Sequence, residues 1–85
     1  MVERARIDLA AAELALGHLD TAEDTLTPVW LVPVPQRRHS LTERLAQIAR
    51  MLSGDKWHGD HRASELRDHI EVFNTEAESR ALPSA

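Results

Sequence analysis

The chain has 85 residues, no cysteine and a formal net charge of −4, with acidic and basic residues interleaved. This length allows one small domain or a piece of a larger one. The lack of cysteine excludes disulfides and cysteine-based metal sites, and the charge balance argues against nucleic-acid binding by this segment. No apolar run approaches the roughly 20 residues of a membrane span, and the first residues lack the apolar core of a secretion signal, so we expect a cytoplasmic protein.

The first predicted helix, from about Val2 to Leu16, is apolar on two faces. One face carries apolar residues at helical spacing: Val2, Ala5, Leu9, Ala12 and Leu16. A second stripe lies roughly opposite: Ile7, Ala10, Ala11 and Leu14. The rest of the chain can cover one face more easily than two. We therefore expect the second stripe, with Ile7 and Leu14, to contact a segment that precedes Met1 or another copy of the chain.

The second helix is predicted to follow a glycine turn. Gly17 tolerates the positive φ that commonly ends a helix, and Asp20 and Glu23 have nearly the spacing of a capping box, which starts the helix at Thr21. Four residues can face the first helix: Ala22, Leu26, Val29 and Trp30. Because Pro28 removes a backbone donor, we expect it to kink or shorten this helix.

The third helix is predicted to follow the loop "PVPQRRH", residues 33–39. Ser40 and Glu43 match the S-x-x-E capping box. One continuous apolar stripe then follows: Leu41, Leu45, Ile48 and Leu52. The pair Ser53 and Gly54 is expected to end the helix.

A fourth helix is predicted to begin near Asp60. Its apolar residues share one face: Ala63, Leu66, Ile70 and Phe73. After Asn74 the periodicity is lost, so residues 75–85 are expected to be a flexible tail and residues 1–74 a helical module. The predicted fold class is all-α, with two antiparallel helix pairs.

The turn between the first two helices resembles the central part of a tetratricopeptide repeat. In "LALGHLDTAEDTL" the residues Gly17, Leu19 and Ala22 fall where that repeat places a helix-ending glycine, an apolar residue and a small residue. The full packing signature consists of Leu9, Ala10, Gly17, Leu19, Ala22 and Leu26. The pattern departs from the repeat at Glu13, where an aromatic residue is preferred, and at Val29, where a small one is. The resemblance implies a tetratricopeptide-like pair of antiparallel helices.

Residues 5–74 as a whole resemble the C-terminal region of bacterial XRE regulators. The resemblance is carried by "DLAAAELALGHLDTAEDTLTPVWLVPVPQRRHSLTERLAQIARML" and "WHGDHRASELRDHIEVF". Proteins of that family join a Cro/CI-type helix-turn-helix to a helical sensor region, and nothing in this chain matches the DNA-reading part. The resemblance therefore implies the C-terminal part of a transcriptional regulator that lacks its DNA-binding domain.

The stretch "DKWHGDH", residues 55–61, allows two interpretations. As a metal site it would offer imidazole and carboxylate ligands to Zn²⁺: Asp55, His58, Asp60 and His61. As an interhelical turn it would use Trp57 to cover the helix ends, Gly59 to turn the chain and Asp60 to cap the next helix. We favour the turn because the ligand spacing is not specific, and we expect no metal and no cofactor.

We expect no catalysis, because no serine lies in a G-x-S-x-G turn. Two other features are candidate binding sites. The basic loop with Arg37 and Arg38 is either solvated or a contact for a phosphate or an acidic peptide. Trp30 either covers the edge of the core, which we favour, or lies in a peptide-binding groove.

The leading functional hypothesis is a protein-interaction or ligand-sensing helical-repeat module, not an enzyme. Its partner would be a protein or peptide, or the N-terminal part of the same protein. The alternative hypothesis is a stand-alone helical protein that forms a homo-oligomer through the first helix.

Overall fold

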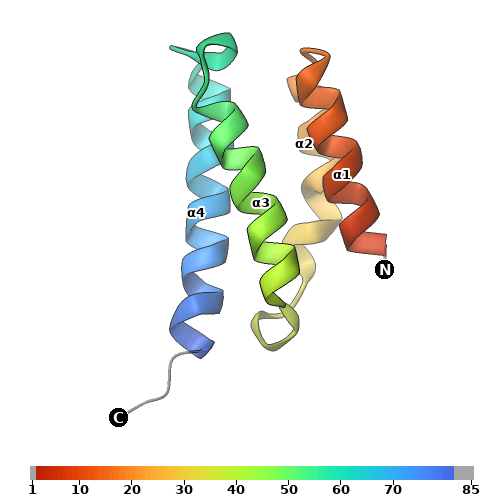
Figure 1. Cartoon of the computed structure of the whole chain (residues 1–85), viewed down its shortest axis with the longest axis vertical. Coiled ribbons are helices and arrows are strands. Elements are labelled where there is room, and N and C mark those ends of the chain that lie inside the picture. The colour runs from red at the N-terminus through yellow and green to blue at the C-terminus, as the bar shows by residue number, and fades with distance from the viewer. Residues whose placement is uncertain (1, 82–85) are drawn as a thin grey trace.

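The computed structural model describes the backbone of residues 2–81 and the side chains of residues 4–78 (Figure 1). Four α-helices follow one another: α1 (Val2–Ala15), α2 (Leu19–Leu26), α3 (His39–Leu52) and α4 (His61–Ala81). Three short 3-10 helices occupy the connections: η1 (Thr27–Leu31), η2 (Val34–Gln36) and η3 (Asp55–Trp57). No strand occurs between residues 2 and 81. The predicted all-α class with four helices is confirmed.

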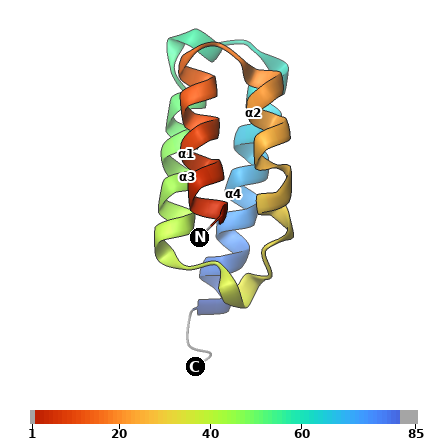
Figure 2. The ribbon, with the colours of Figure 1, turned by 90° about the vertical axis from the view of Figure 1, so that its right-hand side faces the viewer.

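The helices form two antiparallel hairpins that pack against each other. Helix α1 packs on α2, and α3 packs on α4. The second view shows α1 in front of α3 and α2 in front of α4, so that one hairpin covers the other (Figure 2). Direct packing of α1 on α3 joins the hairpins into one elongated body of 42 × 26 × 16 Å.

Every residue buried in the described part of the chain is apolar. The two predicted stripes of α3 and α4 are confirmed as core: Leu41, Leu45, Ile48, Leu52, Ala63, Leu66, Ile70 and Phe73. The first hairpin adds Ala22, Leu26 and Val29, which were expected to face α1 and are fully buried. The core is therefore one continuous layer between the hairpins, held by burial of apolar surface.

The prediction for the two faces of α1 is wrong: the stripe with Ile7 and Leu14 lies in the core, and the opposite stripe is exposed. Ile7 and Leu14, expected to contact a preceding segment or another copy of the chain, are 1% and 0% exposed within this single chain. Leu9 and Leu16, on the other face, are 52% and 70% exposed. Helices α2 and α3 both reach α1 from the side of Ile7. We call the uncovered stripe the open face of α1, and its members are Ala5, Leu9, Ala12 and Leu16.

The turn between α1 and α2 takes the expected form, but the helix start does not. Gly17 has φ of 87°, which favours glycine, and α2 stops at Leu26, before Pro28, so the predicted shortening is confirmed. The helix begins at Leu19 with no side-chain cap, and Asp20 lies inside its first turn. Leu19 is only 8% exposed, and it is the first residue of the helix. Because the helix starts at this buried leucine, Asp20 lies too late in the chain to act as the N-cap.

The predicted cap of α3 is wrong, whereas that of α4 is confirmed. Helix α3 begins at His39, and its N-cap Arg38 makes no side-chain cap. The backbone carbonyl of Arg38 accepts bonds from the Leu41 and Thr42 amides, which places Ser40 inside the first turn. At α4, Asp60 Oδ1 accepts a bond of 3.1 Å from the Ala63 amide, as an N-cap aspartate does.

Helix α4 runs well past the predicted boundary at Asn74. Residues 75–81 are helical, so the expectation of a flexible tail is wrong there, and residues 82–85 lie outside the described range. Ala77 continues the apolar stripe of the helix and is 8% exposed. Asn74 Nδ2 donates to the Thr42 carbonyl at 2.9 Å, which ties this part of α4 to the start of α3. Burial and this bond hold the extra two turns.

Within the described residues, no helix is long and apolar enough to cross a membrane.

Candidate functional site

A concave polar site lies beside the start of α1, the connection between α2 and α3, and the start of α3. The cavity has a volume of about 570 Å³, within the usual range for small-molecule sites. We call it the arginine pocket, and its lining residues are Arg4, Val32, Pro35, Gln36, Arg38, Ser40 and Leu41. Two segments far apart in the sequence, the first turn of α1 and residues 32–41, therefore contribute to one concave surface.

The arginine pocket carries positive charge. Arg4 comes from the first turn of α1 and Arg38 from the residue before α3, and both side chains are exposed. None of the described residues that line the pocket is acidic, although acidic residues outnumber arginine and lysine by 14 to 10 in the chain. Helix α3 starts at this point, and the positive end of its dipole adds to the field. The pocket thus favours an anion.

The pocket also has an apolar part. Val32 and Pro35 come from the connection after η1, and Leu41, only 9% exposed, comes from the first turn of α3. An inorganic anion would use only the arginines, whereas an organic anion could also cover these carbons. The lining therefore suits a ligand with one anionic group and an apolar body.

Arg37, a candidate anion contact together with Arg38, has a structural role instead. Its side chain is 8% exposed and donates to the Val32 carbonyl at 3.0 Å and to the Phe73 carbonyl at 2.9 Å. A salt bridge to Glu76 at 3.1 Å completes the set. Neither the solvated interpretation nor the anion contact holds for Arg37. By fixing the connection to α4, it sets the position of Arg38 at the pocket.

Trp30 belongs to the edge of the core, as favoured from the sequence. It is half-buried against the core cluster, stacks on His69 with ring centroids 4.2 Å apart and meets Phe73 edge-on at 5.4 Å. These contacts join η1 to α4.

The packing signature of the first hairpin is buried except at two positions. Four of its members lie in the core: Ala10, Leu19, Ala22 and Leu26. Gly17 supplies the turn, and Leu9 lies on the open face of α1. Ala10 and Ala22, both fully buried, let α1 and α2 approach closely.

The stretch 55–61 forms the connection between α3 and α4. Gly59 turns the chain with φ of 80°, Trp57 packs against the core, and Lys56 Nζ donates to the Ala15 carbonyl at 2.7 Å, which caps the end of α1. His61 pairs with Glu65 at 2.7 Å on the surface. Across the described residues, no three side chains of the His, Cys, Asp or Glu type are grouped to hold a metal ion.

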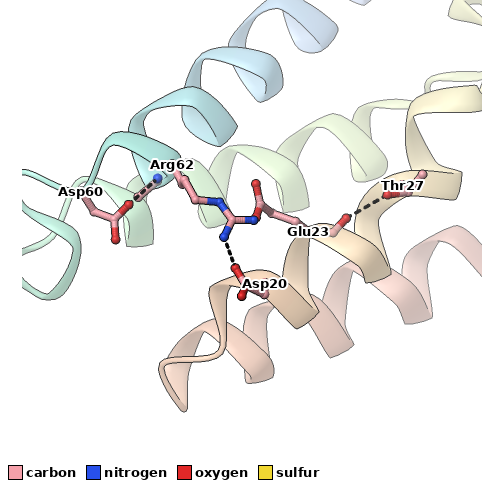
Figure 3. A network of polar contacts seen from close by, with 6 residues as sticks. Asp20, Glu23, Thr27, Asp60 and Arg62 are labelled. Atoms are coloured by element: carbon pink, nitrogen blue, oxygen red, sulfur yellow. Dashed lines mark hydrogen bonds and ion pairs between the residues drawn. The ribbon is translucent and has the colours of Figure 1, made fainter.

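An ion-pair network that the sequence analysis missed links the starts of α2 and α4 (Figure 3). The guanidinium of Arg62 donates to the carboxylates of Asp20 and Glu23. Glu23 and then Asp20 raise the pKa of Arg62 because a nearby negative charge favours the protonated form. Helical spacing of Asp20 and Glu23 could have suggested a shared cation, but nothing local in the sequence identifies Arg62 as that cation.

No protein-family model matches the chain, and no curated protein or solved structure matches it either.

Proposed function

We propose that this chain is a ligand-sensing helical module that binds a small organic anion in the arginine pocket. In this proposal the module is the C-terminal part of a cytoplasmic transcriptional regulator of the XRE type, and the DNA-binding domain lies outside the segment. The resemblance of residues 5–74 to the sensor regions of such regulators supports this assignment. The partner of the module in this proposal is a protein or peptide, or the N-terminal part of the same protein, and ligand binding changes its contact with the module.

One observation carries the proposal: two arginines and no acidic residue among the described lining of a cavity of about 570 Å³. A guanidinium binds a carboxylate through parallel hydrogen bonds, and such charge-assisted bonds are stronger than neutral ones. The apolar carbons of Val32, Pro35 and Leu41 would cover the body of the ligand. An aromatic carboxylate such as benzoate combines both features and is a suitable probe.

Binding would be coupled to the rest of the fold through Arg4 and Arg38. Arg4 belongs to the first turn of α1, whereas Arg38 precedes α3. A ligand that bridges them ties the ends of two helices that pack on each other. In this proposal, the ligand binds more tightly to the conformation in which the starts of α1 and α3 are close together. Binding therefore shifts the population toward that conformation, by an amount set by the difference in affinity for the two conformations.

Thermal unfolding with benzoate, and with benzamide as a neutral ligand of the same shape, tests the proposal. At ten times its dissociation constant, benzoate should stabilise the folded chain by about 1.4 kcal/mol, and benzamide should have a much smaller effect. Arg4→Gln and Arg38→Gln should each reduce the benzoate effect. Arg50→Gln is the matched control, because Arg50 is an exposed arginine in the last turn of α3. Equal effects of benzoate on all three variants would overturn the proposal.

A further inference from the structure

The open face of α1 has the pattern of a coiled-coil seam. Its residues Ala5, Leu9, Ala12 and Leu16 are separated by four, three and four positions, which is the spacing of a heptad repeat over two heptads. Leu16 keeps the helical register beyond the last residue of α1, since its amide donates to the Ala12 carbonyl at 3.2 Å. The seam therefore runs along the whole helix and remains exposed in the single chain.

We propose that a second copy of this chain docks on this seam, with the two α1 helices antiparallel. A two-fold axis between Leu9 and Ala12 places each Leu9 opposite Ala12 of the other copy. The same axis places each Leu16 opposite Ala5 of the other copy. Every layer then joins one large and one small residue, which lets the helices interdigitate without voids.

The charges beside the seam fit the same arrangement. Arg6 and Glu13 are seven positions apart, so they share one flank of the helix. In an antiparallel pair, that flank faces the same flank of the other helix, and each Arg6 lies opposite Glu13 of the second copy. Both residues are half-buried. Thr25 Oγ1 donates to Glu13 Oε1 at 2.7 Å, which fixes this carboxylate and leaves its second oxygen for Arg6.

A parallel pair would not have these properties. It would join Leu9 to Leu9 and Ala12 to Ala12, giving one crowded layer and one underfilled layer. Arg6 and Glu13 would then face the opposite flank, which carries Asp8, and Asp8 already pairs with Arg44 of α3 at 2.6 Å. Steric fit and charge both select the antiparallel dimer of this chain.

The contact is short, and this sets the expected affinity. The twelve residues from 5 to 16 span about 16 Å along the helix axis, so the buried area lies below that of a standard interface. We expect a weak, reversible dimer, as is typical of interfaces with a small buried area.

Sedimentation equilibrium of the full chain up to about 1 mM measures the association. Leu9→Lys should weaken dimerisation at least roughly tenfold, because it places a charge in an apolar layer. Val72→Lys is the matched control, since Val72 is a 59% exposed apolar residue on α4, which packs on α3 and η2. A wild-type chain that stays monomeric at 1 mM, or equal weakening by both variants, would overturn the proposal.

Charge reversal separates antiparallel pairing from other modes of association. Arg6→Glu alone and Glu13→Arg alone each bring like charges together twice per dimer and should weaken self-association roughly tenfold. A mixture of the two variants restores both opposite-charge pairs, so heterodimers should form with wild-type affinity. Circular dichroism of each variant verifies that the helices remain folded. If the folded variants do not associate more strongly when mixed than alone, the antiparallel arrangement is wrong.

The dimer and the arginine pocket stand on separate observations. Leu9→Lys leaves the pocket residues unchanged, so the benzoate effect should persist in this variant. Loss of dimerisation with intact benzoate binding would support both proposals independently.

Discussion

The guanidinium of Arg37 lies 3.6 Å from the centroid of the Phe73 ring and also donates to the Phe73 carbonyl. One side chain therefore fastens the connection between the two hairpins to the face of α4. The cation over the ring and the hydrogen bonds to backbone carbonyls both gain strength from the low exposure of Arg37, 8% at its side chain. The position of the arginine pocket depends on this attachment, because Arg38 is the next residue.

Replacing Arg37 by methionine should lower the free energy of unfolding by about 2–3 kcal/mol, since charge-assisted hydrogen bonds and a cation–π contact are lost together. Urea denaturation followed by circular dichroism gives this value. Arg38→Met, at an exposed neighbouring position, is the control and should change stability by less than about 0.5 kcal/mol. Equal losses in the two variants would contradict the structural role of Arg37.

The two leucines of α1 should differ sharply in their effect on stability. Leu14→Ala removes a fully buried side chain and should cost about 3 kcal/mol. Leu9→Ala truncates a side chain that is 52% exposed and should cost less than about 0.5 kcal/mol in the monomer. Denaturation at a concentration well below that of dimer formation makes the comparison. A larger loss for Leu9→Ala than for Leu14→Ala would contradict the structure, because it would mean that the face of α1 with Leu9 is the buried one.

The end of α4 should contribute to folding. A chain that stops after Asn74 loses the buried Ala77 and the salt bridge between Arg37 and Glu76. Its urea midpoint should therefore fall below that of a chain that stops after Ala81. Identical midpoints would mean that residues 75–81 behave as the flexible tail that the loss of periodicity predicts.

The Arg62 network should stabilise the fold in a salt-dependent way. Arg62→Gln breaks both contacts, to Asp20 and to Glu23, and should lower the melting temperature at low ionic strength. The difference should shrink in about 1 M NaCl, where the Debye length is about 3 Å. Arg50→Gln controls for the change in net charge. A difference that is independent of salt would mean that Arg62 acts through packing instead of charge.

Much of the fold follows from the sequence because α3 and α4 each carry only one apolar face. Leu45 and Ile70 have only one way to be buried, so their positions in the core could be predicted. Helix α1 is different, because two opposite faces are comparably apolar. Which one is buried depends on where α2 and α3 lie, and that information is not local. The same holds for the N-caps: Asp20 matches a cap by spacing but takes part in a contact with α4.

The arginine pocket shows the same limit. Arg38 stands out in the sequence because it is part of a basic loop, whereas Arg4 is one of several charged residues on a helix surface. Only the packing of α1 against α3 brings Arg4 to that loop. A site assembled from two distant segments leaves no short spacing that a sequence motif could capture.

An NMR titration of the ¹⁵N-labelled chain with benzoate tests the central claim most directly. The account predicts saturable shifts at the amides of the pocket residues Arg4, Val32, Gln36, Arg38, Ser40 and Leu41, which are absent with benzamide and strongly reduced in Arg4→Gln and Arg38→Gln. Shifts that are absent with benzoate, or that appear elsewhere on the chain and survive both substitutions, would contradict a ligand-sensing role for this pocket.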